Sequence, residues 1–280
     1  MKQNILITGG TGFIGQAIQN HSFFKNAIFV VRKKNKNVKN SVVVNFNDTK
    51  SINEALKKID CVIHMAGLAH DNQAKKENYM KSNYFLTKKL VDISKKNKIK
   101  KFIYLSTIKV LGEETINNKK FKYNDPYNPK DFYAESKYLS EKYIISTLKK
   151  TKTEYVIIRP PLVYGKGVKG NFSNLIKIIK FSFILPFKSF NNKKSYVSIN
   201  NLINFIILCI TSKKSKNNIF HVCDKKDISL SELILKMKSI YGSKKIFINF
   251  PPFLIRLIFF IFLKKKTFSK IYEPLRVDQH

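Results

Sequence analysis

Short apolar runs alternate with amphipathic stretches through the first two-thirds of the chain. Runs rich in Val, Ile, Phe and Tyr predict β-strands over residues 4–8, 27–31, 41–44, 61–66, 101–106 and 155–160. Between them, apolar residues recur at helical spacing and predict helices over 12–20, 51–58, 78–97 and 133–149. Because the strands are almost continuously apolar and alternate with helical crossovers, the pattern predicts a parallel sheet covered by helices on both faces.

The pattern becomes less regular after about residue 165, where strands are shorter and loops longer. We therefore expect an α/β fold: a Rossmann-type doubly wound parallel sheet over residues 1–165, and a smaller C-terminal substrate-binding lobe over 166–280 with some elements returning to the core. The apolar stretch "PPFLIRLIFFIFL" (251–263) falls short of the ~20 residues that span a bilayer as a helix. It is predicted to pack on the core as an amphipathic helix, with a membrane surface as the alternative.

Composition adds a strong positive charge. The 280 residues include 53 Lys and Arg against 18 Asp and Glu, a formal net charge of +35. Lysines occur in nearly every segment and arginine is rare, whereas specific nucleic-acid binding uses arginine and one basic face. We therefore expect no specific nucleic-acid partner, but weak attraction to polyanions and peripheral contact with anionic membranes.

The cysteines and the N-terminus indicate the compartment. Cys61, Cys209 and Cys223 are scattered, with neither disulfide nor metal-ligand spacing. The apolar run "ILITGG" begins too close to Met1 and is too short for a signal peptide. We expect a cytoplasmic protein without a metal.

The first predicted strand runs into the glycine-rich loop "TGGTGFIG" (8–15), which opens a helix. Gly9, Gly12 and Gly15 allow a tight turn and close approach of the backbone to a pyrophosphate, which the N–H groups of the following helix can bind. Strand, loop and helix stand in the required order, so the sequence predicts dinucleotide binding.

The end of the second predicted strand bears on the choice of dinucleotide. It reads "FVVRKK" (29–34), with Arg32 and no acid where an NAD site usually has a carboxylate for the ribose hydroxyls. An arginine there can bind a 2′-phosphate. We expect NADP in preference to NAD.

Candidate chemistry lies on the helix that begins "FYAESKYLSEKY" (132–143). Tyr133 and Lys137 are four residues apart and share one helix face, where the lysine would lower the tyrosine pKa and make it an acid or base. Ser106 and Thr107 stand at the carboxyl end of the preceding strand, the edge at which doubly wound sheets bind ligands. These side chains can converge on one carbonyl oxygen.

Together, "TGGTGFIG", "HMAG" (64–67), "LST...VLG" (105–112), "YAESK" (133–137) and "RPPLVYG" (159–165) resemble the extended short-chain dehydrogenase/reductase family, the nucleotide-sugar epimerases, dehydratases and ketoreductases. The resemblance covers residues 3 to about 278. It implies that Tyr133 is the general acid/base, Lys137 its ribose-binding partner, and Thr107 a hydrogen-bond donor to the sugar oxygen.

The resemblance also implies the binding residues. The cofactor would contact Gly9, Gly12, Phe13, Ile14, Gly15, Arg32, Ala66, Gly67, Asn83, Ser106, Tyr133, Lys137 and Pro160. The substrate would contact Thr107, Lys109, Asn171 and Lys194, the last standing where the family usually has a diphosphate-binding arginine. His70 in "AGLAHDN" is a further candidate to face the sugar.

The finer pattern is similar to a UDP-glucose 4-epimerase-like subgroup that includes 4-keto-6-deoxy-hexosamine nucleotide reductases of bacterial surface-polysaccharide synthesis. With Arg32, it favours a reductase that uses free NADPH on a UDP-linked sugar. The alternatives are a UDP-hexose or UDP-N-acetylhexosamine 4-epimerase with tightly bound NAD, and a non-catalytic dinucleotide sensor. A homodimer through the helices at 78–97 and 133–149 is expected, and relatives continue for a few tens of residues beyond His280.

Overall fold

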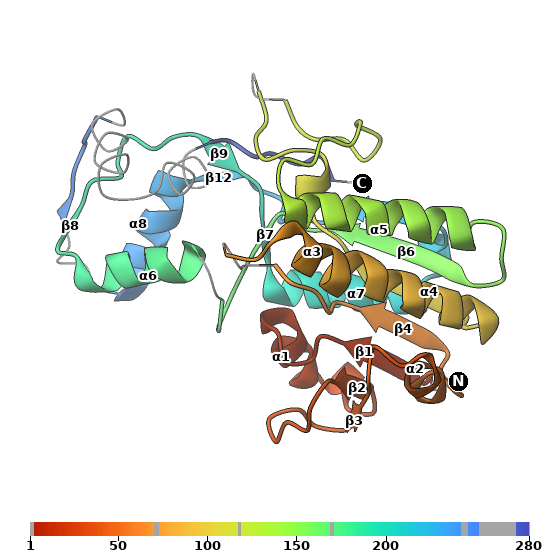
Figure 1. Ribbon diagram of the computed structural model, residues 1–280. Helices are drawn as coiled ribbons and strands as arrows, with labels where there is room; N and C mark the ends of the chain where they lie inside the picture. Colours follow the sequence, from red (N-terminus) through yellow and green to blue (C-terminus); the bar gives the residue numbers. More distant parts are fainter. Residues whose placement is uncertain are drawn as a thin grey trace.

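A seven-stranded parallel sheet forms the centre of the protein (Figure 1). The computed structural model describes residues 3–69, 73–116, 119–168, 171–241, 246–251 and 273–279. The strands, in the order β11-β6-β5-β4-β1-β2-β3, are β11 (Asn218–His221), β6 (Glu154–Arg159), β5 (Lys101–Leu105), β4 (Cys61–His64), β1 (Ile5–Thr8), β2 (Ile28–Val31) and β3 (Ser41–Val43). The chain reverses its direction of winding between β1 and β4, which confirms the predicted doubly wound sheet.

Helices cover both faces of the sheet. One face packs against α2 (Thr49–Ala55), α4 (Leu86–Lys96) and α5 (Phe132–Leu148), and α4 and α5 lie side by side (Figure 1). The other packs against α1 (Phe13–Gln19) and α7 (Ile199–Thr211). Odd and even strand positions divide between these two apolar clusters, with Ile5 and Ile7 in one and Leu6 in the other, because side chains alternate along a strand.

The helix predicted over 78–97 is continuous but not uniform. It consists of α3 (Lys76–Tyr79), the π-helix η2 (Met80–Phe85) and α4. A π-helical turn widens a helix locally and often marks a functional position. Here the turn contains Asn83, one of the predicted cofactor residues. Two 3₁₀ turns, η1 (Ser22–Phe24) and η3 (Ile108–Val110), follow α1 and β5.

The lobe is built from short elements around its own apolar cluster. These are α6 (Asn171–Phe181), β8 (Ile184–Leu185), β9 (Lys193–Lys194), β12 (Ile228–Ser229), α8 (Leu230–Tyr241) and β13 (Ile246–Phe247). The pair β7 (Leu162–Tyr164) and β10 (Tyr196–Ser198) connects it to the core, and η4 (Lys213–Ser215) leads into β11. Because α7 and β11 belong to the core although they follow the lobe's first elements, the boundary at residue 165 stays a prediction.

The C-terminal segment 273–279 joins the lobe to the core. Its Leu275 bridges to Lys194 and its Val277 to Phe121, in the loop between β5 and α5. The helix predicted over 251–263 lies almost entirely outside the described residues. In the part of the chain that the structure describes, no helix has the length and apolar character needed to cross a membrane.

Candidate active site

The glycine loop between β1 and α1 is tightly folded. Gly9 has a φ of +85°, and a Cβ on it would lie 2.8 Å from the backbone nitrogen of Ala66. A Cβ on Gly15 would lie 2.2 Å from the carbonyl oxygen of Gly9. Glycine is therefore required at both positions for steric reasons.

Gly12 is less crowded than Gly9 and Gly15. A Cβ there would approach only the Gly9 carbonyl oxygen, at 3.3 Å. Gly12 is the N-cap of α1, and no side chain caps the backbone N–H groups of the first helical turn. The cradle fits the pyrophosphate of a dinucleotide, which small residues and free N–H groups bind.

The carboxyl end of β2 is open to solvent. Val31 is buried, and Arg32 beyond it is exposed. No acid stands beside it in the sequence, so the ribose end of the predicted site has a positive side chain where a carboxylate is usual.

Buried hydrogen bonds hold the loop after β4 in place. The Thr8 hydroxyl accepts from the N–H groups of Met65 and Ala66, at 3.2 and 3.1 Å, and bonds His64 Nδ1 at 2.7 Å. Asn83 on η2 accepts from Leu68 N–H at 2.7 Å and donates to the Leu68 carbonyl at 3.1 Å. These bonds fix Ala66 and Gly67 between the glycine loop and α5.

Asn83 has a wider role than the sequence predicted. Its Nδ2 also donates to Ser136 Oγ on α5, at 2.8 Å, and its Oδ1 would lie 2.7 Å from a Cβ on Gly67. The side chain therefore joins η2, the loop after β4 and α5.

Thr107, Tyr133 and Lys137 come together at the carboxyl edge of the sheet. Thr107 lies close enough to Tyr133 for its hydroxyl to lower the pKa of the phenol through a hydrogen bond. Lys137 is only 4% exposed, and its Nζ donates to the carbonyl oxygen of Leu105 at 2.8 Å and lies 4.6 Å from the ring centre of Tyr104. The same Nζ would lie 3.7 Å from a Cβ on Gly67, which places Lys137 beside the loop after β4 that packs against Gly9.

Burial controls the acidity of the pair. It raises the pKa of Tyr133 well above its usual range, reinforced by Asp131 and opposed by the hydrogen bond from Thr107. It lowers the pKa of Lys137 to about 8, opposed by the charge of Glu141. The expectation that Lys137 brings the tyrosine pKa below its ordinary value is therefore wrong for this arrangement, because loss of hydration raises that pKa by more than the hydrogen bond from Thr107 lowers it.

A buried ion pair lies beneath the triad, and sequence reasoning missed it. Arg159 and Glu141 are 1% and 0% exposed, and Arg159 Nη2 donates to Glu141 Oε2 at 2.6 Å. Tyr127 donates to the same carboxylate at 2.9 Å and accepts from Arg159 at 2.8 Å. The only sequence signal was a carboxylate one turn after Lys137 on a predicted helix.

Ser106 belongs to this buried network. Its hydroxyl donates to Glu141, and its N–H donates to the Ile158 carbonyl oxygen at 2.8 Å. Its contact with the cofactor stays a prediction. The bonds of Ser106 fix the backbone from which Thr107 projects.

The remaining predicted residues are dispersed. The carbonyl oxygen of Pro160 accepts from Ile108 N–H at 3.0 Å. Lys109 pairs with Glu113 at 2.8 Å and Asp131 at 3.0 Å, so its ammonium is engaged within the protein. On β9, burial lowers the pKa of Lys194 to about 8.

Two candidates cannot be placed. Asn171 begins α6, but its side chain lies outside the described residues, as does all of His70. Their contacts with substrate therefore stay predictions. Among the described residues, no group of three His, Cys, Asp or Glu side chains could hold a metal ion.

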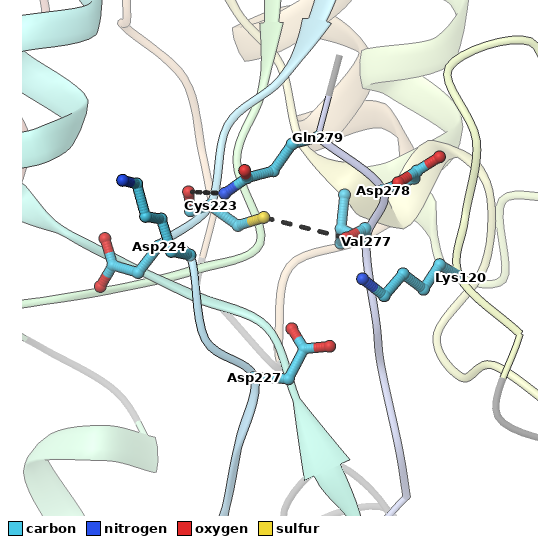
Figure 2. Close-up of a pocket in the computed structure, with 8 residues that line it drawn as sticks. Lys120, Cys223, Asp224, Asp227, Val277, Asp278 and Gln279 are labelled. Carbon is cyan, nitrogen blue, oxygen red and sulfur yellow. Dashed lines mark hydrogen bonds between the residues drawn. The ribbon is translucent and has the colours of Figure 1, made fainter.

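A small polar pocket lies elsewhere, beside the C-terminal segment. Figure 2 shows Cys223 and Asp227 facing Val277 and Lys120, with Gln279 donating to the Cys223 carbonyl oxygen at 2.8 Å. Its volume of about 90 Å³ is below the few hundred Å³ that small-molecule sites occupy. None of the triad lines it, so it is not the predicted active site.

A Rossmann sheet with a Tyr–Lys pair beside the glycine loop defines an extended short-chain dehydrogenase/reductase. The chain belongs to the NAD dependent epimerase/dehydratase family, whose model matches residues 5–223. This confirms the predicted family and enzyme class. The family is NAD-dependent, in agreement with the nicotinamide cofactor predicted from the loop.

Relatives and solved structures agree with this assignment. The chain is 32% identical over 289 residues to the UDP-glucose 4-epimerase of Vibrio cholerae, an alignment covering 99% of this chain and 88% of that protein. It is 24% identical over 248 residues, 87% of this chain and 74% of that protein, to the N-acetyl-alpha-D-glucosaminyl-diphospho-ditrans,octacis-undecaprenol 4-epimerase of Escherichia coli O157:H7. The fold matches the UDP-glucuronic acid 4-epimerase of Bacillus cereus, solved with UDP-glucuronic acid and NAD, with a TM-score of 0.76 and 20% identity over 99% of this chain and 90% of that chain.

Proposed function

We propose that the protein is a nucleotide-sugar 4-epimerase that retains NAD and acts on a UDP-hexose or UDP-N-acetylhexosamine. The observation that carries the proposal is the meeting of Thr107 and Tyr133, with Lys137 beside Gly67 in the loop that packs against Gly9. The relatives support it, because the Vibrio cholerae and Escherichia coli proteins are 4-epimerases. They favour this alternative over the reductase expected from the sequence.

The proposed chemistry takes place at C4 of the sugar. NAD held by the glycine loop at Gly9, Gly12 and Gly15 would supply reversible hydride transfer at C4, so that hydride lost from one face of the sugar is regained on the other. Tyr133 Oη takes the proton of the 4-hydroxyl in the first half-reaction and gives it back in the second. No net oxidation results.

The surrounding residues control that proton. Tyr133 is protonated at neutral pH, since burial moves its pKa further above the ordinary value of 10, and this suits the step that donates a proton to the ketone. Before it can accept the proton of a 4-hydroxyl, Tyr133 has to release its own to water, and the positive charge of Lys137 one turn away favours the phenolate. Thr107, hydrogen-bonded to Tyr133, holds the sugar oxygen in line with it.

A reductase that uses NADPH is the second candidate. The exposed Arg32 at the end of β2, with no acid beside it, favours a cofactor with a 2′-phosphate. The triad serves both reactions, since it fixes chemistry at one carbonyl and not the fate of the ketone. The two functions therefore differ in their use of cofactor: an epimerase retains NAD, whereas a reductase consumes NADPH.

Two measurements on the full chain separate them. The protein is denatured after purification, and the released dinucleotide is identified by mass spectrometry. Native protein is then incubated with UDP-glucose or UDP-N-acetylglucosamine without added cofactor. An epimerase releases NAD and forms the 4-epimer. No retained NAD, together with stoichiometric NADPH consumption on a 4-keto-6-deoxy sugar nucleotide, would show a reductase instead.

If the protein is instead a non-catalytic dinucleotide sensor, it should form no 4-epimer and consume no NADPH. Both residues of the Tyr–Lys pair are present, which argues against a sensor.

The cytoplasmic location, the homodimer through α4 and α5 and the substrate contacts of Lys109, Asn171 and Lys194 stay predictions.

A further inference from the structure

Four large apolar side chains are exposed together at the far end of the lobe. They are Phe181 at 85% exposure, Phe183 at 61%, Ile184 at 52% and Ile246 at 48%. We call this group the lobe tip. β8 and β13 are paired in parallel with Ile184 opposite Ile246, and Ile246 N–H donates to the Phe183 carbonyl oxygen at 2.9 Å. Ile184 and Ile246 therefore lie side by side, and Phe181 and Phe183 come just before Ile184 in the chain.

The lobe tip is not needed for the lobe's own core. The apolar cluster of the lobe is formed by neighbouring residues that are buried, among them Ile179, Leu185 and Phe187. Leu185 alternates with Ile184 along β8 and points inward, which leaves Ile184 on the outer face. β8 lies at the end of the lobe away from the sheet and its active-site edge (Figure 1). Exposed apolar groups of this kind indicate an interaction surface.

The charge around the lobe tip selects the partner. Residues 171–194 contain no acid and have lysines at positions 177, 180, 188, 193 and 194. Lys177, Lys180 and Lys188 are exposed. A second copy of the chain would bring the same positive charge to the contact, with +35 on each copy, so self-association through this face is opposed electrostatically.

We propose that the lobe tip docks on the surface of an anionic lipid membrane. The phenylalanine and isoleucine side chains enter the boundary between headgroups and acyl chains, while the lysines remain at the level of the anionic headgroups. The contact is peripheral, and it holds the protein at the membrane without a spanning segment. It is independent of the proposed epimerase activity and can be tested without a sugar substrate.

The test uses flotation of the full chain with vesicles. Wild-type protein is expected to float with vesicles of equimolar phosphatidylglycerol and phosphatidylcholine and not with phosphatidylcholine alone. The variant F181S/F183S is expected to bind the anionic vesicles about tenfold more weakly, because two large apolar groups no longer enter the boundary. The matched control F23S/V43S removes two exposed apolar side chains, 40% and 54% exposed, that lie outside the lobe on η1 and β3, and it should bind like wild type.

Three outcomes would overturn the proposal. Failure of wild-type protein to float with anionic vesicles at low salt would exclude the membrane as partner. Equal binding by wild type and F181S/F183S at about 50 mM and about 500 mM salt would show that general charge, and not the lobe tip, causes association. A lower thermal midpoint or a changed oligomeric state of F181S/F183S would show that the lobe tip packs within the protein or against a second copy.

Discussion

The carboxyl edge of the sheet has two halves that are built in different ways. The nucleotide half, at β1 and β2, relies on backbone: three glycines shape a loop, and the adjoining Arg32 is exposed. The catalytic half, at β4, β5 and α5, relies on buried side chains, with Lys137, Glu141 and Arg159 almost fully enclosed. A flexible dinucleotide is bound by close backbone approach, whereas proton transfer needs side chains held in one place.

The difference has an energetic side. Buried charges lose hydration, so the partners of Lys137 and Arg159 must be in place before the fold is stable. Exposed pairs such as Lys57–Glu54 remain hydrated and contribute little. The catalytic half is therefore expected to tolerate few changes, and the nucleotide half to tolerate those that leave its backbone path free.

Removal of the Tyr133 hydroxyl is expected to have the largest effect. Tyr133→Phe should lower kcat about a thousandfold, because the proton of the sugar hydroxyl has no acceptor. Tyr143→Phe is the matched control on the same helix, since its hydroxyl bonds Asp92 at the surface and should be dispensable for turnover. Full activity of the Tyr133 variant would refute the catalytic assignment.

Loss of the buried arginine should mainly reduce stability. Arg159→Met leaves Glu141 charged and without its partner, and is expected to lower the free energy of unfolding by about 3–5 kcal/mol in urea denaturation. Lys57→Met, at the exposed pair, should change it by less than about 1 kcal/mol. Replacing both members of the buried pair, as in E141L/R159M, should restore much of the loss. A similarly small change in the free energy of unfolding for Arg159→Met and Lys57→Met would contradict the expected difference between the buried and the exposed pair.

The glycines can be used to separate folding from binding within the nucleotide half. Gly15→Ala places a methyl group against the Gly9 carbonyl oxygen and should lower the free energy of unfolding by about 1–3 kcal/mol. Gly12→Ala meets only the Gly9 carbonyl oxygen, at 3.3 Å, and should weaken NAD binding with a smaller loss of stability than Gly15→Ala. Calorimetric titration measures NAD binding and thermal melts measure stability in both variants. Equal thermal midpoints would contradict the prediction that a methyl group at Gly15 clashes with the backbone.

The smallest expected effect is on pH dependence. Burial lowers the pKa of Lys137 from its ordinary value of 10.5 to about 8, so its positive charge is lost as the pH rises through 8. We expect kcat/KM to fall on the alkaline side near that pH. Because the folded state binds fewer protons than the unfolded state between pH 8 and 10.5, this group also makes the free energy of unfolding rise over that interval.

Glu141 sharpens this prediction. Its negative charge raises the pKa of Lys137, so Glu141→Gln should move the alkaline limb of the kcat/KM profile to lower pH. An unchanged profile in that variant would show that another group titrates there.

Much of this arrangement could be predicted along the chain. The predicted strands and helices agree with the structure to within a few residues, because their apolar periodicity is a local property. The glycine loop was recognisable because its residue spacing reflects local sterics. The π-helical turn at Asn83 could not be predicted, since its sequence reads as ordinary helix.

The amino-acid sequence by itself determined the order of the elements, the glycine loop and the helix face shared by Tyr133 and Lys137. Only the tertiary structure decided what surrounds them. Arg159 reaches Glu141 across 18 residues of sequence, and Lys137 reaches Leu105 across 32. Contacts of that kind depend on how strands and helices pack, and burial of the same side chain can reverse a pKa shift that helix spacing alone predicts.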